Sequence, residues 1–551
     1  MIEKFLTQTS FSSEEDFAKN FHLHAEDDFN FAYDVMDEWA KTHPDKQALL
    51  WTNDKGESKR LTFADVKEQS DKTAAYFHSL GIGKGDMVLI ILKRRLEFWL
   101  TMLALHKIGA VAIPATHLLT ANDIIYRNNS AKVKAIICVG DEYVVKNVAA
   151  SVAESPTVET LISVGPEVPE GFHDFHAEWL NTPEFTPTKN NKITDTMLVY
   201  FTSGTSGEPK MVAHNYGYAL GHLATGVYWH NLTMDSIHLT IADTGWGKAV
   251  WGKLYGQWFA GATVFVYDHE KFHAADILKK IEEYKITSFC APPTIYRFML
   301  EEDFSKYDLS SLKYCCTAGE ALNASVFEEF KKLTGLQIME AYGQTETTLI
   351  IGTFPWIKPR PGSLGKPNPQ YEMDIVDEEG NSCPPYETGE IVVKIEHGRP
   401  FGLFKDYALE PERTKYIWRG GMYHTCDIAY KDDEGYYWFV GRNDDIIKSS
   451  GYRISPFEVE SAILKHPATV ECAVTAVPDD IRGNIVKATI VLSKQWDGPT
   501  GDELVKDIQN FVKHETAPYK YPRVVEFVDE LPKTISGKIR RVVIRERDKT
   551  K

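Results

Sequence analysis

The segment Thr202-Ser203-Gly204-Thr205-Ser206-Gly207-Glu208-Pro209-Lys210 is the stretch from which the fold of this chain can be worked out. It follows residues 197–201, an apolar run whose β-branched and aromatic side chains predict a buried strand. Its glycines permit positive φ and a close backbone approach to a ligand, while four hydroxyl groups and a lysine can contact an anion. The segment therefore predicts a phosphate-binding loop. Its spacing differs from the Walker motif, and an ordinary surface turn is the alternative when it is considered alone.

The length and charge of the chain narrow the classes of function. Its 551 residues exceed what one hydrophobic core organises, so roughly three to four domains or subdomains are expected. Acidic residues outnumber basic ones, 78 against 61, which gives a formal net charge of -17. Sequence-independent binding of nucleic acid needs a basic face, so nucleic acid is not an expected partner. A local basic site for a nucleotide is still compatible with this charge.

The cysteines and the apolar runs bear on the compartment. Seven cysteines without C-x-x-C spacing predict free thiols in a reducing compartment rather than disulfides or a zinc site. The N-terminal residues do not combine a basic stretch with an apolar one, so no secretory signal is expected. No apolar run approaches 18 residues, so no membrane span is expected. The expected location is cytoplasmic.

Alternating strand and helix patterns predict parallel βαβ units in the first three quarters of the chain. The first series has expected helices at residues 63–80 and 97–106 and expected strands at residues 87–92, 111–114 and 133–139. The second series has expected strands at residues 237–242, 263–267, 286–291, 312–316 and 336–340. The fold class is therefore α/β, and the two series predict two doubly wound subdomains.

The pattern changes after residue 371. Short strands and turns predict a small β-rich subdomain, and residues 445–551 predict a compact α+β module. The expected domains are therefore a large N-terminal domain, residues 1–441, and a small mobile C-terminal domain, residues 442–551. The charged segment Gly441-Arg442-Asn443-Asp444-Asp445 joins them, and a hinge is expected near Asp444.

A second polar cluster, Ala341-Tyr342-Gly343-Gln344-Thr345-Glu346, follows an expected strand. Ligands of open α/β sheets bind at the carboxyl ends of strands, so this position suits a binding site. Glu346 can hold Mg²⁺ through oxygen, Thr345 can donate to a phosphate, and Tyr342 offers a face for a base to stack on. The start of a capped helix is the alternative when the motif is considered alone.

Four further clusters carry polar or charged residues at expected turns and strand ends. They are Thr317-Ala318-Gly319-Glu320-Ala321-Leu322, His424-Thr425-Cys426-Asp427, the segment 441–445 continuing into Lys448-Ser449-Ser450-Gly451-Tyr452-Arg453, and Pro532-Lys533-Thr534-Ile535-Ser536-Gly537-Lys538-Ile539-Arg540. Each of them alone is compatible with a solvated turn or a surface charge run. Six such clusters in one chain and in this order favour a common site.

Taken together, these motifs resemble the core motifs of the adenylate-forming superfamily, which includes acyl-CoA synthetases, luciferases and peptide-synthetase adenylation domains. The resemblance covers nearly the whole chain, from about residue 61 onward. Ser206 and the run Asp243-Thr244-Gly245-Trp246 resemble the medium-chain acyl-CoA synthetases most. The family implies an acid–thiol ligase that uses ATP, Mg²⁺, a carboxylic acid and coenzyme A.

The resemblance also implies roles for the matching residues in a first step that forms an acyl-adenylate. Residues 202–210 would grip the β- and γ-phosphates, Thr345 would touch the α-phosphate, and Glu346 would bind Mg²⁺. Lys538 would bridge the carboxylate and the α-phosphate as negative charge builds. The residues implied to line adenine are Gly319, Glu320, Ala321 and Tyr342, and those implied to hold ribose are Asp427 and Arg442.

In a second step, the resemblance implies that the small domain turns about Asp444 and carries Lys538 away. Ser450 and Gly451 would then reach the site, where a glycine lets the pantetheine arm of coenzyme A pass close to the backbone. Arg453 would contact phosphate in either state. Acetylation of Lys538 would remove its charge and silence the first step.

Two residues carry the expectation about the acid. Trp246 falls where the family places an acyl-pocket aromatic, and a core tryptophan is the alternative. Gly343 matches a bulky tryptophan of acetyl-CoA synthetases, so a glycine here predicts a longer, branched or aromatic acid. Three other functions stay open: loading of a carrier-protein pantetheine, a luciferase-type oxygenase, and a catalytically silent nucleotide-binding regulator. The sequence also leaves open whether the chain forms a homodimer.

Overall fold

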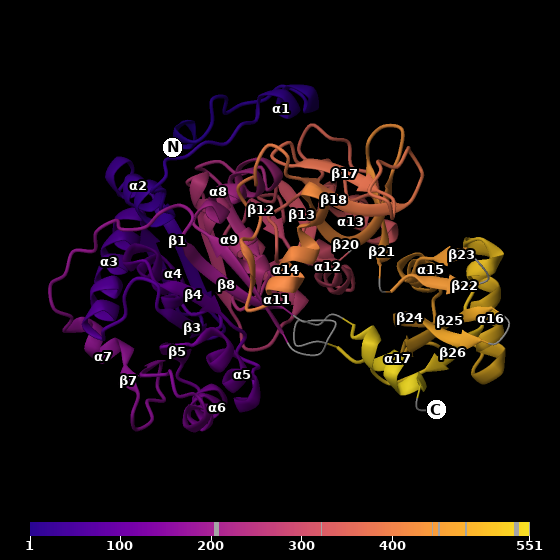
Figure 1. Cartoon of the computed structure of the whole chain (residues 1–551). Helices are drawn as coiled ribbons and strands as arrows, with labels where there is room; N and C mark the ends of the chain where they lie inside the picture. Colours follow the sequence, from indigo (N-terminus) through magenta and orange to yellow (C-terminus); the bar gives the residue numbers. More distant parts are fainter. Residues whose placement is uncertain are drawn as a thin grey trace. The chain divides into compact units, whose positions relative to one another are not determined.

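The computed structural model describes residues 1–202, 209–320, 322–443, 445–449, 452–479, 482–533 and 539–549 (Figure 1). The chain forms two compact units. The first comprises Met1–Glu372 and Lys394–Gly421, and the second comprises Met373–Val393 and Met422–Lys551. The β-rich segment expected after residue 371 thus belongs mostly to the unit that holds the C-terminal module. The domain boundary expected at residues 441 and 442 stays a prediction.

One sheet of the first unit contains, among the described residues, eight strands, of which the central ones are parallel. In spatial order they are β19 (Asp406–Ala408), β9 (Lys210–Asn215), β8 (Thr196–Thr202), β4 (Val111–Pro114), β3 (Met87–Ile91), β5 (Ala135–Val139), β6 (Thr160–Val164) and β7 (His173–Asp174). The apolar run before the phosphate loop is β8, as expected. Its neighbours β9 and β19 are antiparallel additions at one edge.

A second sheet of the first unit contains nine strands in the described part of the chain. In spatial order they are β16 (Lys366–Pro367), β15 (Ile351–Gly352), β14 (Ile338–Tyr342), β13 (Tyr314–Ala318), β12 (Ser288–Cys290), β10 (Ile237–Thr240), β11 (Thr263–Asp268), β1 (Gln47–Asn53) and β2 (Ser58–Thr62). The six strands from β14 to β1 run parallel. The α/β class and its two wound sheets are therefore confirmed.

The chain does not build these sheets one after the other. Strands β1 and β2 precede every strand of the eight-stranded sheet, yet they complete the edge of the nine-stranded one. Five consecutive residues of β1 are buried, because the strand is covered on both faces. A continuous apolar run fits a buried strand and a buried helix segment equally well, and residues 48–50 lack the β-branched side chains that help to identify a strand, so periodicity alone does not assign residues 47–53.

Helices of the first unit lie between and beside the strands (Figure 1). The longest, α3 (Phe63–Ser79), begins with a capping box in which Thr62 and Asp65 satisfy each other's backbone N–H groups. All twelve residues of α4 (Glu97–Ile108) are buried, so this helix is an interior element. The others are α1 (Glu14–Asn20), α2 (Glu38–Thr42), α5 (Ala121–Ala131), α6 (Glu142–Ser151), α7 (Phe175–Leu180), α8 (Gly217–Leu223), α9 (Gly247–Lys253), α10 (Tyr255–Phe259), α11 (Ala274–Glu283), α12 (Pro293–Leu300), α13 (Ala324–Thr334) and α14 (Pro411–Ile417).

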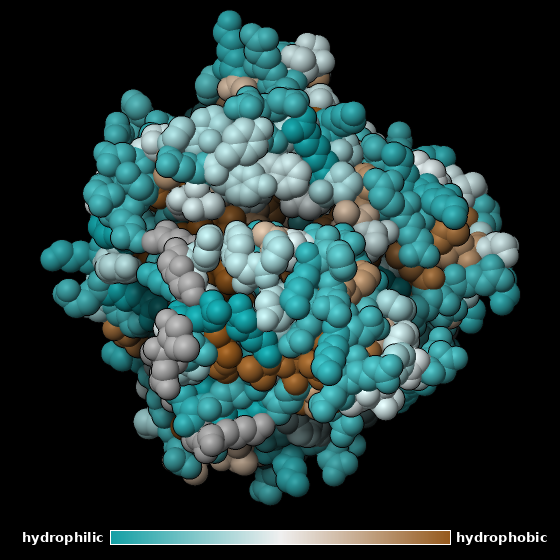
Figure 2. All heavy atoms as spheres, turned by 90° about the vertical axis from the view of Figure 1, so that its right-hand side faces the viewer, coloured by the Kyte–Doolittle hydropathy of each residue, from teal (hydrophilic) through white to brown (hydrophobic). Residues whose placement is uncertain are grey.

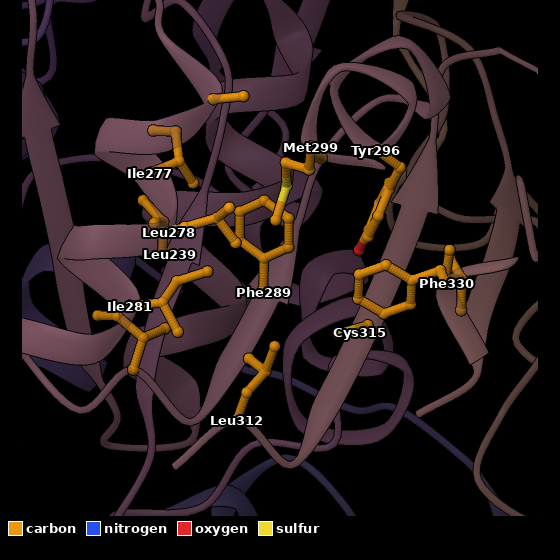
Figure 3. Packing of buried hydrophobic residues seen from close by; sticks show 14 of the residues in the cluster. Leu239, Ile277, Leu278, Ile281, Phe289, Tyr296, Met299, Leu312, Cys315 and Phe330 are labelled. Atoms are coloured by element: carbon orange, nitrogen blue, oxygen red, sulfur yellow. The ribbon is translucent and has the colours of Figure 1, made fainter. Parts of the chain in front are cut away.

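A hydrophobic cluster fixes the middle strands of the nine-stranded sheet against their helices. Figure 3 shows Met299 beside Phe289, and Tyr296 facing Phe330. The ring centroids of Tyr296 and Phe330 are 5.1 Å apart with an edge-on geometry, which is favourable for aromatic pairs. This packing holds β12, β13 and β14 rigidly, and the polar motifs follow directly from two of these strands.

In the part of the chain that the structure describes, the second unit contains three small sheets. The four-stranded sheet has the order β17 (Glu372–Val376), β18 (Gly389–Lys394), β20 (Met422–Lys431) and β21 (Tyr437–Arg442). A hairpin pairs β22 (Ile447–Ser449) with β23 (Tyr452–Ile454), and a third sheet has the order β24 (Thr469–Asp479), β25 (Gly483–Leu492) and β26 (Val524–Phe527). Its helices are α15 (Pro456–Ile463), α16 (Gly501–Glu515) and α17 (Arg541–Lys549).

An ion-pair cluster anchors α17 within the second unit. Arg541, the first residue of α17, donates from Nη2 to both carboxylate oxygens of the buried Glu460 at 2.7 Å. Arg545 donates to Asp445 Oδ1 at 2.5 Å, and the backbone N–H of Val474 donates to Glu460 Oε1 at 2.8 Å. The helix that follows residue 538 is thereby tied to the residue that follows the expected hinge.

Hydrophilic residues make up most of the face drawn in Figure 2, in keeping with the 25% of charged residues in the sequence. Among the described helices, none has the length and apolarity needed to cross a membrane.

Candidate active site

Two of the expected clusters lie side by side at the carboxyl ends of neighbouring strands in the nine-stranded sheet. Strands β13 and β14 are parallel neighbours, and Ala318 is opposite Ala341 near their carboxyl ends. Gly319 and Glu320 follow β13, whereas Tyr342 is the last residue of β14. The strand extends two residues further than expected, which places Tyr342 in the sheet rather than after it. The structure thus brings together Gly319, Glu320 and Tyr342, and Ala321 lies outside the described residues.

The loop after β13 has features that suit close approach of a ligand. Gly319 has φ +103°, which favours glycine, and both Gly319 and Glu320 are exposed. Lys248 Nζ donates to the carbonyl of Ala318 and lies 3.9 Å from where a Cβ of Gly319 would be. Glu320 Oε2 accepts a hydrogen bond from Thr294 Oγ1 at 2.9 Å.

A buried carboxyl that sequence reasoning missed holds this loop to β14. Glu340 is 4% exposed, and its Oε1 accepts a hydrogen bond from the backbone N–H of Leu322 at 3.0 Å. Burial raises the pKa of Glu340 to about 8, so the group is mostly protonated near neutral pH. The sequence signal was a carboxyl two residues before Tyr342, in a stretch that otherwise reads as an interior strand.

Thr345 and Glu346 lie in the turn that follows β14. The carbonyl of Thr345 is 2.9 Å from His214 Nε2, and burial lowers the pKa of His214 to about 3. His214 is therefore neutral at pH 7, with the proton on Nε2 so that it can donate to that carbonyl. The half-buried Glu346 is held twice: its Oε1 accepts from Tyr407 Oη at 2.7 Å, and its carbonyl accepts from the Phe404 N–H at 2.7 Å.

The two ends of the expected phosphate loop face each other. Thr202 ends β8 and Lys210 begins β9, and the two residues are paired across the antiparallel strands. Lys210 is buried, and its Nζ is 5.5 Å from the ring centroid of Tyr407. Tyr407 therefore contacts both Lys210 and Glu346, which joins the loop end to the carboxylate. Residues 203–208 of the expected loop lie outside the described residues.

The residues expected to bind the acid have a neighbour that sequence reasoning missed. A Cβ built on Gly343 would lie 2.4 Å from both the Thr348 carbonyl oxygen and the Trp251 ring. The space beside Gly343 is therefore not open to a longer acid, because the Trp251 indole fills it. Trp251 lies on α9, five residues after Trp246, which immediately precedes that helix.

A polar network positions the segment that ends at Trp246. Asp243 Oδ1 accepts from the Gly245 N–H at 2.9 Å, and its Oδ2 lies 3.4 Å from His117 Nδ1 and 3.8 Å from Arg94 Nη1. Burial opposes ionisation of Asp243, but the nearby His117, the hydrogen bond from the Gly245 N–H and the positive charge of Arg94 outweigh it, so the pKa of Asp243 is lowered. Asp243 is thus ionised at neutral pH and fixes the turn before α9.

The residues expected to hold ribose lie together in the second unit. Asp427 on β20 is opposite Arg442 on β21 in an antiparallel pair. The preceding residue, Cys426, has φ +59°, a conformation that is costly for a residue with a Cβ. Its N–H donates to Glu390 Oε1 at 2.8 Å, and His424 Nδ1 lies 2.9 Å from Glu390 Oε2. Glu390 therefore braces the strand segment that presents Asp427.

The remaining expected residues lie in or beside segments of the second unit that the structure does not describe. The backbone of Arg453 is described, and it pairs with Lys448 in the β22–β23 hairpin. Residues flanking Lys538 are also described: Lys533 pairs with Ile539, and the Arg540 N–H donates to the Pro532 carbonyl at 2.8 Å. Asp444, Ser450, Gly451 and Lys538 themselves lie outside the described residues.

Family models match most of the chain. A model described as AMP-binding enzyme matches residues 36–407, and one described as AMP-binding enzyme C-terminal domain matches residues 458–538. The chain belongs to the AMP-binding enzyme family. This confirms the resemblance drawn from the motifs.

The named relatives of this chain are acyl-CoA synthetases, and the similar solved structures include CoA ligases. The Mus musculus protein "Acyl-coenzyme A synthetase ACSM3, mitochondrial" is 40% identical over 549 residues, covering 98% of this chain and 94% of the relative. The Mus musculus ACSM4 protein is 42% identical over 527 residues, covering 94% and 90%. Among solved structures, the anthranilate CoA ligase AuaEII in complex with anthranoyl-AMP has a TM-score of 0.87 at 29% identity, covering 96% of this chain and 98% of that chain. A Brucella canis acyl-CoA synthetase has a TM-score of 0.73 at 29% identity, covering 98% and 99%.

The comparisons correct one expectation. The cytoplasmic location expected from the free thiols and the N-terminal residues is wrong, because the ACSM3 and ACSM4 relatives are named as mitochondrial proteins. Free thiols indicate a reducing compartment without distinguishing the cytosol from the mitochondrial matrix.

The residues of this AMP-binding enzyme can be tested for their fit to Mg²⁺. Among the described residues, no group of three or more His, Cys, Asp or Glu side chains is arranged to hold a metal. Mg²⁺ usually takes one or two carboxylates together with substrate phosphates and water, rather than a protein cage. A single carboxylate, Glu346, linked through Tyr407 to Lys210, fits that mode of binding.

Proposed function

We propose that this AMP-binding enzyme is an AMP-forming acyl-CoA synthetase, an acid–thiol ligase that joins a carboxylic acid to coenzyme A with ATP. The observation that carries the proposal is the double contact of Tyr407. It joins Lys210, at the end of the expected phosphate loop, to Glu346, beside the carboxyl edge of the nine-stranded sheet. The proposed phosphate-binding cation, Lys210, and the proposed metal-binding carboxylate, Glu346, both contact this ring, which supports a site for ATP with its metal. The named relatives support the same reaction class.

In the first step, a carboxylate oxygen attacks the α-phosphorus of ATP and pyrophosphate leaves, which yields an acyl-adenylate. Positioning and charge neutralisation supply most of the catalysis in such phosphoryl chemistry. We assign the α-phosphate contact to Thr345, the metal contact to Glu346 and the bridging contact to Lys538. Mg²⁺ bound at Glu346 would neutralise charge on the phosphates. Gly319, Glu320, Ala321 and Tyr342 are the proposed adenine residues, and Asp427 with Arg442 the proposed ribose pair.

In the second step, the thiol sulfur of coenzyme A attacks the acyl carbonyl carbon, the bond to the phosphate oxygen breaks, and AMP leaves. We assign the pantetheine passage to Ser450 and Gly451, and a phosphate contact to Arg453. The small C-terminal domain turns about Asp444 between the steps in this proposal.

The proposed acid is medium-chain, branched or aromatic, rather than acetate. The resemblance of the run that ends at Trp246 to medium-chain acyl-CoA synthetases supports this, whereas the space beside Gly343 is filled by the Trp251 ring and adds no room for a longer acid. The solved anthranilate and benzoate CoA ligases have the same fold, with TM-scores of 0.87 and 0.80.

A carboxylate panel tests the function. The full-length protein is incubated with ATP, Mg²⁺, coenzyme A and acetate, butyrate, octanoate, 2-methylbutyrate or benzoate, and acyl-CoA and AMP are measured. Butyrate-to-octanoate, branched or aromatic acids should give both products faster than acetate. Acetate as the best substrate contradicts the proposed acid class. Acyl transfer to a carrier-protein pantetheine but not to free coenzyme A favours the carrier-loading alternative, and no adenylate with any acid favours the silent regulator.

The homodimer that the sequence leaves open stays a prediction. The mass of the protein in solution, measured by light scattering with and without ATP, decides between a monomer and a dimer.

A further inference from the structure

We propose that Tyr407 is a positioning residue for the metal and phosphate end of the site. In this proposal its hydroxyl orients the Glu346 carboxylate, and its ring spaces two cations, Lys210 and Arg413, around the place where the polyphosphate binds. The inference rests on the proposed function and deepens it, because none of the six polar clusters of the sequence contains Tyr407.

The first support is the way in which Glu346 is held. Tyr407 Oη donates to Glu346 Oε1 at 2.7 Å, and Tyr407 is only 4% exposed, so this bond is shielded from water. The backbone N–H of Phe404 donates to the Glu346 carbonyl at 2.7 Å. One short segment thus fixes both the backbone and one carboxylate oxygen. Within the described ranges, no hydrogen bond or ion pair to Oε2 is found, so that oxygen can face a cation.

The second support is the pair of cations around the ring. Lys210 Nζ is 5.5 Å from the ring centroid of Tyr407, and Arg413 Cζ is 5.7 Å from it. Both distances fall within the range of a cation–π contact. Arg413 also lies 3.2 Å from a carboxylate oxygen of Glu410 on the solvent side. Lys210, Arg413 and Glu346 around a single ring, with Glu410 paired to Arg413 on its outer side, suit a polyphosphate with its divalent metal better than they suit a neutral ligand.

The third support is the rigidity of the backbone that carries Tyr407. Strand β19 is antiparallel to β9, and Tyr407 is opposite Val212, two residues after Lys210. The Tyr407 N–H donates to Thr414 Oγ1 at 3.0 Å, which ties the strand to α14. The ring therefore has a fixed position relative to both Lys210 and Arg413, as an orienting group needs.

A purely structural role makes a different prediction from a positioning role. Tyr407 also packs against Phe404, with ring centroids 4.9 Å apart, so the ring could serve packing alone. Packing depends on the ring and is kept by phenylalanine, whereas orientation of Glu346 depends on the hydroxyl. The substitution Tyr407→Phe therefore separates the two roles.

The test measures binding of Mn²⁺, a probe for Mg²⁺, rather than turnover. Mn²⁺ is titrated by its paramagnetic effect on water relaxation, with the full-length protein and the non-cleavable analogue α,β-methylene-ATP. Tyr407→Phe should weaken Mn²⁺ about 10- to 100-fold, the usual cost of losing a hydrogen bond to a metal ligand. Binding of the analogue without metal should not change. Arg413→Gln should do the reverse, weakening the metal-free analogue about threefold to tenfold.

Tyr267→Phe is the matched control. Tyr267 Oη donates to Asp54 Oδ1 at 2.5 Å, so this substitution also removes a tyrosine–carboxylate bond, but on β11, which three strands separate from β14. Unchanged Mn²⁺ affinity in a folded Tyr407→Phe protein overturns the inference. An equal loss of Mn²⁺ affinity in Tyr267→Phe also overturns it. If Tyr407→Phe does not fold, unchanged binding of the metal-free analogue to Arg413→Gln overturns it. Formation of acyl-adenylate by the wild-type protein is measured separately, as pyrophosphate release. If no acyl-adenylate forms, the proposed function is rejected rather than the role of Tyr407.

Discussion

Gly343 lies against two neighbours that leave no room for a side chain. A Cβ there would approach the Thr348 carbonyl oxygen and the Trp251 ring to 2.4 Å, and the carbonyl cannot move without the turn that carries Glu346. The consequence reaches both the stability of the fold and the shape of the acyl end of the site.

Gly343→Ala should lower the free energy of unfolding by about 1–3 kcal/mol, because it overpacks a closed position. It should also lower kcat/KM for the best medium-chain or aromatic acid about 10-fold or more, since displaced Trp251 narrows the site. Urea unfolding and the acid panel measure the two effects. Gly83→Ala is the control, because a Cβ on Gly83 meets nothing within 4 Å. Equal behaviour of the two variants contradicts the close packing at position 343.

Glu340 makes stability depend on pH. Its folded pKa is about 8, whereas an ordinary glutamate titrates near 4.5, so between these values the folded state binds a proton that the unfolded state has lost. Stability from this group is therefore fully present below about pH 4.5 and is lost as the pH rises towards 8.

Glu340→Gln should remove that pH dependence, because the amide keeps the acceptor for the Leu322 N–H without a titrating proton. The wild-type free energy of unfolding should fall relative to the variant by up to about 1.4 kcal/mol per pH unit between pH 5 and pH 8. Urea unfolding at pH 5, 6, 7 and 8 gives the difference directly. Parallel pH profiles for the two proteins would show that Glu340 titrates normally.

At the scale of elements, α17 depends on a buried carboxylate. Arg541→Met should destabilise the second unit by about 3 kcal/mol, because it leaves Glu460 buried without its cation. Arg545→Met is the comparison, and it should cost about 1 kcal/mol or less, because Asp445 is more accessible to water. Urea unfolding followed by fluorescence checks both. A larger loss for Arg545→Met reverses the expected order and contradicts the role given to Glu460.

Strands and helices that carry a local sequence signal could be predicted from the sequence, whereas those whose identity depends on a distant partner could not. Strand β8 and helix α3 carry local signals, an apolar run before a glycine-rich segment and a capping box with a long amphipathic stretch. Strand β1 is identified only once β11 is beside it, and β14 extends past residue 340 because β13 and β15 pair with its end.

The same division holds for the candidate site. Thr345, Glu346 and Lys210 could be predicted from the sequence because they belong to local motifs. Trp251, Glu340 and Tyr407 could not be predicted, because their importance comes from contacts with residues distant in the sequence. Trp251 lies against Gly343, Glu340 accepts from the Leu322 N–H, and Tyr407 donates to Glu346. Tyr407 is 61 residues from Glu346 along the chain, and no spacing rule joins them.

At the scale of the whole molecule, the proposed two-step reaction predicts that Lys538 serves one step only. Lys538→Ala should slow adenylation, followed as pyrophosphate release, on the order of 100- to 1,000-fold, because a charge contact made in the transition state is lost. Thioester formation from supplied acyl-adenylate should be nearly unchanged. Stopped assays of each half-reaction measure this, with Lys533→Ala as the control. Equal losses in both half-reactions contradict the assignment of Lys538.

The crossing of β1 into the nine-stranded sheet has a consequence for how the protein is made. Leu49 pairs with Val264, so a ribosome must add about 215 residues before the partner of β1 has even been synthesised. At roughly 5–20 residues per second, that takes roughly 10–40 s, during which β2 is the neighbour already available to β1 and β11 is still missing. The first strand of the chain therefore acquires its second neighbour only after about half of the chain has been made, and one of its edges has no strand to pair with until then.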